Sequence, residues 1–176
     1  MVTLESIEQH TIPFDQFELK WRFTEEIHNV LPEIHLEQIK PLDKPASEML
    51  NNLTNAVFDA RFQLDPLQFK HVEAVQIPDG LESEQIIKKW LYRRGLPFEQ
   101  QVYVSWDLGC ASITTWKMIV KYWSDFWYPG WDDLVVVDKT LSWALVIYHY
   151  DYIEFGTNRE RHAEGPAGEL VGTGTP

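Results

Sequence analysis

The densest group of side chains that could do chemistry lies in residues 123–133, which read WSDFWYPGWDD. Indole and phenol rings are common anchors of protein interfaces, and carboxylates beside them attract a cationic partner. The segment therefore predicts a partner-binding surface made of Trp127, Tyr128, Trp131, Asp132 and Asp133. Two alternatives stay open at this point. The rings fill the core while the aspartates cap turns, or the segment lines a groove for a carbohydrate or another small ligand.

A second constellation joins His149 and Asp151 to the acids of that segment, with Glu154 a few residues further on. Residues two apart on a strand point to the same face, so His149 and Asp151 are expected to lie side by side. With Asp132 or Asp133 they offer nitrogen and oxygen ligands for a divalent metal, or a histidine–carboxylate pair for acid–base catalysis. The alternative function is therefore a metal-dependent or His/carboxylate hydrolase. The competing structural explanation is a strand-end histidine hydrogen-bonded to a turn carboxylate.

Other motifs give weaker indications. Neither Ser105 nor Cys110 lies in a G-x-S-x-G elbow, so a nucleophilic role for either is poorly supported, and Cys110 is expected to be a partly buried structural thiol. The sequence contains no G-x-G-x-x-G and no G-x-x-x-x-G-K-[ST] phosphate loop. One basic cluster consists of Lys88, Lys89, Arg93 and Arg94. It lacks interleaved exposed aromatic residues, so we expect it to face solvent and not nucleic acid.

The spacing of apolar residues predicts the elements that position these groups. Helices are expected over residues 45–58, 84–94 and 112–126, with Ser83 as the N-cap and Gly95 just past the end of the second. Strands are expected over 14–23, within 64–77, and over 101–106, 134–137, 142–150 and 152–155, and residues 32–42 are expected to be partly extended. Consecutive hairpin strands in the second half predict an antiparallel sheet with two or more helices packed on it. The predicted fold is a single α+β domain over residues 1–156 followed by a flexible tail over 157–176.

Composition limits the function classes. The chain of 176 residues has 27 acidic and 15 basic residues, and the resulting net charge of −12 excludes a general nucleic-acid binder. No apolar run approaches the roughly 18 residues that a membrane-spanning helix needs, and the N-terminal residues lack the pattern of a secretory signal. The single cysteine, Cys110, fits a reducing compartment. We therefore expect a cytoplasmic protein that contacts neither membrane nor nucleic acid.

A longer pattern extends these motifs. The run TTWKMIVKYWSDFWYPGWDDLVVVD, followed by WALVIYHYDYIEFG, resembles a family of small acidic bacterial proteins that form a domain of unknown function. In that family a helix ending in Trp-Asp-Phe leads into a Tyr-Pro-x-x-Asp-Asp loop and a strand pair that closes in Phe-Gly. The resemblance is strongest over residues 106–156, and the KWRF and QIKPL segments are similar to the family's amino-terminal half. It implies no catalytic residues and no cofactor.

The chain is also similar in type to immunity proteins of bacterial toxin systems, which are acidic, Trp-rich single domains. This similarity implies a protein that blocks a basic toxin by covering its active site. The leading hypothesis is therefore a non-enzymatic binding module that engages a basic protein through its acidic, aromatic surface and needs no cofactor. The hydrolase and a purely structural domain remain as alternatives.

Overall fold

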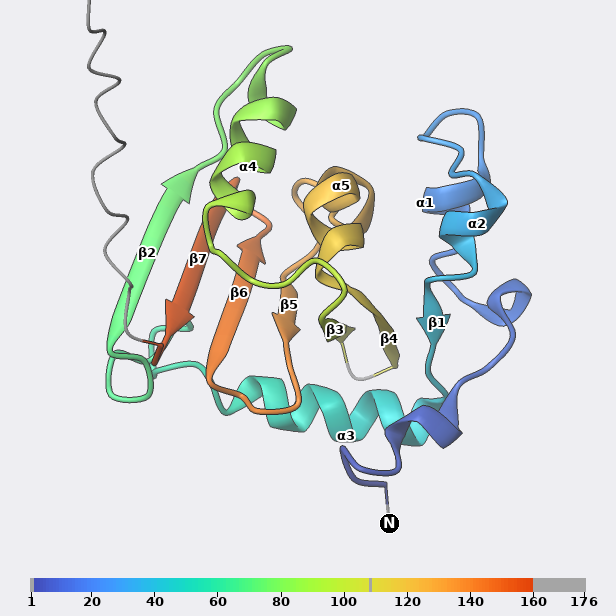
Figure 1. Ribbon diagram of the computed structural model, residues 1–176, viewed down its shortest axis with the longest axis horizontal. Helices are drawn as coiled ribbons and strands as arrows, with labels where there is room; N and C mark the ends of the chain where they lie inside the picture. The colour runs from blue at the N-terminus through green and yellow to red at the C-terminus, as the bar shows by residue number, and fades with distance from the viewer. Residues whose placement is uncertain (1, 108, 160–176) are drawn as a thin grey trace, which may run out of the picture.

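One antiparallel sheet organises the computed structural model, which describes residues 2–107 and 109–159 (Figure 1). Its seven strands lie in the order β1-β4-β3-β5-β6-β7-β2. Helices pack on the sheet, so the predicted α+β class is confirmed. No helix among the residues described here has the length and apolar character to cross a membrane.

The elements follow one another in a simple order, with three hairpin strands at the end. The strands are β1 (Lys40–Pro41), β2 (His71–Gln76), β3 (Gln101–Asp107), β4 (Cys110–Thr115), β5 (Leu134–Val137), β6 (Trp143–Tyr148) and β7 (Tyr152–Thr157). The helices are α1 (Trp21–Thr24), α2 (Glu33–Leu36), α3 (Lys44–Asn55), α4 (Ser83–Tyr92) and α5 (Trp116–Phe126). Two turns of 3-10 helix, Ile7–His10 and Phe14–Gln16, precede α1.

Both faces of the central strands are buried, and the two faces differ in side-chain size. On β6, Trp143, Leu145 and Ile147 belong to the core beneath α4 and α5. The alternate residues Ala144 and Val146 belong to the core beneath α3. Figure 1 shows α3 running across the strand direction, apart from α4 and α5. In the middle of β6 the large side chains therefore fill the space under two helices, while the small ones let α3 approach closely, and the larger Tyr148 follows at the end of the strand.

The first half of the chain departs from the sequence predictions. Residues 14–23 were predicted to form a strand, but they form a 3-10 turn and the start of α1. The rings of Phe14, Phe17 and Phe23 contact one another with centroids 6.0 to 6.5 Å apart, which a strand with alternating side chains would not allow. Residues 32–42 contain the short helix α2 before the two residues of β1.

The predicted helix over residues 112–126 begins later than expected. Residues 110–115 form β4, which pairs along β3, and only then does α5 start. Ile113 and the two threonines that follow are β-branched, which favours a strand. The N-cap is Thr115, whose side-chain oxygen accepts a hydrogen bond from the Met118 amide at 3.4 Å.

The predicted end of the domain at residue 156 is slightly too early. Strand β7 continues through Thr157, and the Asn158 amide donates to the Ser142 carbonyl at 2.9 Å. The Asn158 side chain accepts from the Lys70 amide at 3.0 Å. Residues 157–159 are therefore part of the folded body, and the rest of the predicted tail lies outside the described residues.

Gly156 in β7 provides a test of this packing. A Cβ at this position would lie 2.7 Å from Cγ of Phe69 and 3.1 Å from Cδ1 of Leu64. Because both side chains are buried and the contact is with a ring, Gly156→Ala should destabilise the protein by about 1–3 kcal/mol in urea unfolding. At Gly109 the nearest atom to an added Cβ is 3.6 Å away, so Gly109→Ala is the control. Equal unfolding midpoints for the two variants would contradict this packing.

Candidate functional site

The loop between α5 and β5 folds back on itself and on the β6–β7 turn. The Tyr128 carbonyl accepts hydrogen bonds from the amides of Trp131 at 3.2 Å and Asp132 at 3.3 Å. Gly130, with a positive φ of 77°, permits this tight turn. Its amide donates to the His149 carbonyl at 2.9 Å. The loop and the β6–β7 turn therefore form one connected surface.

A buried ion pair holds this loop to the amino-terminal part of the chain. The Arg22 guanidinium of α1 donates to the Asp132 carboxylate and, at 3.3 Å, to the Phe126 carbonyl. The two side chains of the pair are only 7% and 14% exposed. The Asp132 carboxylate also accepts from the Tyr128 amide at 3.0 Å. Oδ2 of Asp132 thus accepts both hydrogen bonds within the protein and the side chain is mostly buried, which corrects the prediction that Asp132 contacts a partner.

Trp127 was predicted to be exposed on the partner-binding surface, but it is buried. Its side chain is 4% exposed, and its indole N–H donates to the Asp132 carbonyl at 3.1 Å. Its ring stacks on Trp123 with centroids 6.1 Å apart. The predicted partner contact is therefore wrong for Trp127, because this ring completes the buried stripe of α5 and fixes the start of the loop.

The remaining rings of this region are exposed. Trp131 is 82% exposed, Tyr150 48% and Tyr128 39%. Tyr128 is supported from behind by Trp21, with ring centroids 5.9 Å apart, and Tyr150 stacks on Tyr148 at 5.1 Å. We define the Trp131 face as Tyr128, Trp131, Asp133, His149 and Tyr150.

His149 contacts a carboxylate of the loop, although not the one expected from strand spacing. Both its backbone N–H and its ring Nδ1 lie 2.9 Å from Oδ1 of Asp133, and both side chains are 51% exposed. Asp151 lies in the turn with a positive φ of 62°, and its carbonyl accepts from the Ile77 amide at 2.8 Å. The prediction that His149 and Asp151 share a strand face is therefore wrong, because the strand ends at Tyr148.

The structure does not bring together the three residues predicted as alternative metal ligands, Asp132, His149 and Asp151. Within residues 2–107 and 109–159, no group of three His, Cys, Asp or Glu side chains is placed to hold a metal ion. Asp132 is bound to Arg22, which separates it from the predicted set of Asp132, His149 and Asp151. The His149–Asp133 contact remains as an exposed pair on the Trp131 face.

The candidate nucleophiles are buried. Burial raises the pKa of the Cys110 thiol to about 12, so this thiol stays protonated at neutral pH. Ser105 is 1% exposed, and its hydroxyl accepts from the Asn51 side chain at 3.4 Å. Both residues therefore belong to the structural interior.

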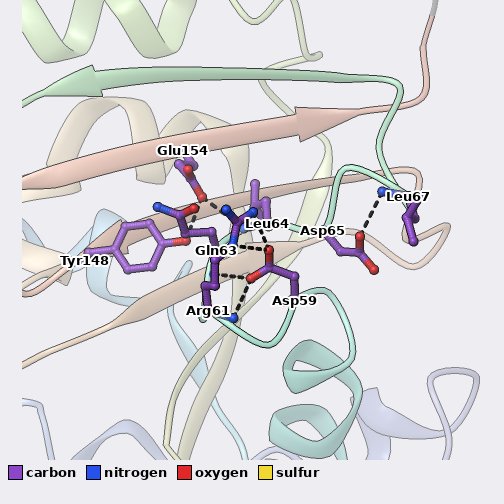
Figure 2. Close-up of polar contacts among 8 residues, drawn as sticks. All are labelled: Asp59, Arg61, Gln63, Leu64, Asp65, Leu67, Tyr148 and Glu154. Carbon is purple, nitrogen blue, oxygen red and sulfur yellow. Dashed lines mark hydrogen bonds and ion pairs between the residues drawn. The ribbon is translucent and has the colours of Figure 1, made fainter.

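Glu154 forms a second polar cluster, on the face of the sheet that packs on α3 (Figure 2). Its buried carboxylate accepts from the Tyr148 hydroxyl at 2.7 Å and from the Leu64 amide at 3.0 Å. Burial and this hydrogen bond raise the pKa of Tyr148 well above its usual range. In the adjacent loop, Arg61 donates to Asp59 through two side-chain nitrogens at 3.0 and 2.8 Å. Glu154 therefore fastens the loop to the sheet and does not join His149 in one site.

Comparisons with protein-family models, with curated proteins and with solved structures found no match to this chain. The resemblances described from the sequence stay predictions. Arg22 is the residue of this region that sequence analysis missed. It lies 110 positions before Asp132, and no spacing rule connects two residues so far apart.

The Arg22–Asp132 pair can be separated experimentally from the exposed acid beside it. Asp132→Asn removes the counter-charge of a buried guanidinium, so the free energy of unfolding should fall by about 3 kcal/mol. Asp133→Asn changes a half-exposed pair and should cost less than about 1 kcal/mol. Chemical denaturation at neutral pH measures both. Similar losses for the two variants would contradict the structural role of Asp132.

Asp125 in α5 gives a pH-dependent prediction. Burial raises its pKa from 3.8 to about 6, against a hydrogen bond from Asn29 that lowers it. Because the folded-state pKa lies above the unfolded one, ionisation destabilises the fold as the pH rises through about 4 to 6. Asp125→Asn should therefore be more stable than the parent above pH 6, and this advantage should vanish below pH 4. Thermal unfolding across this range measures the difference, and a constant offset would contradict it.

Proposed function

We propose that this chain is a cytoplasmic binding protein whose Trp131 face docks on a basic surface of a partner protein. The observation that supports it most directly is the 82% exposed indole of Trp131 on a loop held by buried residues. Removing most of an indole surface from water contributes about 3 kcal/mol to association. The free, buried Cys110 fits the reducing compartment of this proposal.

The loop is suited to binding because its order does not depend on a partner. Asp132 is bound to Arg22 of α1, and the buried Trp127 donates its indole N–H to the Asp132 carbonyl, so the residues that flank the turn are held in place. A ligand that meets a preformed loop avoids the free energy of ordering it. The central Trp131 with Tyr128 and Tyr150 beside it also matches the usual composition of interface hot spots.

The charges around the face favour a cationic partner. Asp133 is half exposed, and Asp151 is exposed in the adjoining turn. Glu25 and Glu26 are exposed in the segment that carries His28, whose ring contacts Tyr128 at 6.3 Å between centroids. Carboxylates at the edge of an interface speed association with a basic surface. A basic toxin, as implied by the similarity in type to immunity proteins, is one partner of this chemistry.

Capture from lysate of the source organism tests the proposal with single-residue variants. Immobilised protein is exposed to lysate at low and physiological salt, and bound proteins are quantified by mass spectrometry. Trp131→Ala should reduce capture of a specific basic protein by about tenfold or more, since it removes the central ring. Leu67→Ala is the matched control, because Leu67 is 93% exposed and lies just before β2, at the end of the sheet away from the β6–β7 turn.

Charge reversal provides an independent readout on the same captured protein. Asp133→Lys should lower capture mainly at low salt and reduce its salt dependence, because it changes a charge at the edge of the face. Equal capture by the parent, Trp131→Ala and Asp133→Lys would remove the Trp131 face from the account. Loss of capture with Leu67→Ala would assign the partner to another surface.

A further inference from the structure

A hollow between α4 and α5 forms a second surface, with the opposite charge. Its volume is about 290 Å³, and it is lined by Lys88, Lys89, Tyr92, Arg93 and Val120. This size lies at the lower end of ligand-binding pockets and suits one or two side chains better than a whole cofactor. Val120 is 9% exposed and contributes aliphatic surface to the hollow.

Three basic side chains line the hollow, Lys88 and Lys89 of α4 and Arg93 just after it. Lys117 and Lys121 of α5 are exposed and lie close to Val120 in the sequence, and together these are five of the 15 basic residues of the chain. Lys117, Val120 and Lys121 share one face of α5 because they are three and four residues apart. Glu84 pairs with Lys88, and Glu99 lies 3.6 Å from Lys117, so part of this charge is neutralised. A local excess of cations remains on an otherwise acidic protein.

Exposed aromatic rings lie beside these cations, contrary to the sequence prediction. Tyr92 is 63% exposed and Phe98 43%, and their ring centroids are 5.7 Å apart. Arg94 was expected to belong to the basic cluster. It is instead 7% exposed at its side chain and bound to Glu73 at 2.8 Å, so it takes no part in the surface. The helices therefore present cations, rings and an apolar hollow together.

We propose that this α4–α5 groove binds an acidic peptide segment of a partner protein, with one apolar side chain in the hollow and carboxylates on the surrounding lysines and arginine. Charge complementarity selects the occupant. A short acidic peptide fits better than a nucleic acid. The acidic residues elsewhere on the surface are screened from a short peptide, since charges more than about 8 Å away have little effect at physiological salt. A long polyanion would extend over those acidic residues and be repelled by them. The groove is separate from the Trp131 face and independent of the function proposed for that face.

Fluorescence anisotropy of the full chain with a short labelled peptide that alternates Glu and Leu tests the proposal. Lys89→Glu/Arg93→Glu should weaken binding about tenfold or more, and Tyr92→Ser should weaken it less. The matched control, Lys44→Glu/Lys139→Glu, reverses two exposed charges outside the groove and should leave affinity within about twofold of the parent. Trp131→Ala should also leave it unchanged, which separates this test from that of the Trp131 face.

Several outcomes would overturn the assignment. These are no binding of the acidic peptide, equal binding of its Gln-for-Glu counterpart, or tighter binding of a labelled oligothymidine. If analytical ultracentrifugation shows that the parent is a dimer and that Lys89→Glu/Arg93→Glu is a monomer, the groove binds a second copy of the chain instead. If that variant fails to fold by circular dichroism, Lys89→Gln/Arg93→Gln replaces it, and unchanged peptide affinity in this neutral variant would equally contradict the proposal.

Discussion

The buried ion pair between Arg22 and Asp132 is the interaction on which the exposed loop depends. A buried guanidinium requires a counter-charge, and Asp132 of the loop supplies it. The backbone carbonyl of Asp132 also accepts a hydrogen bond from the indole of Trp127. Trp127 and Asp132 are held in place in this way, and Trp131, which lies between them in the sequence, is exposed. A partner that met this loop would not have to order it first.

Charge is divided unequally over the surface of this protein. The net charge of −12 correctly describes the whole chain, but it conceals the cations gathered on α4 and α5. The Trp131 face and the α4–α5 groove combine aromatic rings with charges of opposite sign. In the binding proposed for each surface, nearby charges would matter most, because more distant charges are screened. A single chain can in this way present surfaces suited to partners of contrasting chemistry.

The sequence predicted an element correctly where its residue pattern was compatible with only one type of secondary structure. The predicted helices over 45–58 and 84–94 match α3 and α4 closely because each has one apolar stripe. The N-cap predicted at Ser83 is wrong, since α4 already begins at Ser83 and the residue before it, Glu82, makes no side-chain cap hydrogen bond. The segment 112–115 was assigned to a helix wrongly, since a strand buried on both faces shows no alternation to distinguish it. The sequence did not distinguish the exposed Trp131 from the buried Trp127 in the same loop. Asp132 is withdrawn from solvent by its ion pair with Arg22, a contact that only the tertiary structure reveals.

Hydrogen–deuterium exchange with and without the captured partner tests the central claim most directly. In the free chain the amides of Gly130 and Asp132 should already exchange slowly, because each donates to a backbone carbonyl. On binding, additional protection should appear in residues 127–133 and 149–151 and not in α3. Fast exchange of the loop in the free chain, or protection confined to other elements in the complex, would contradict a preformed binding surface centred on Trp131.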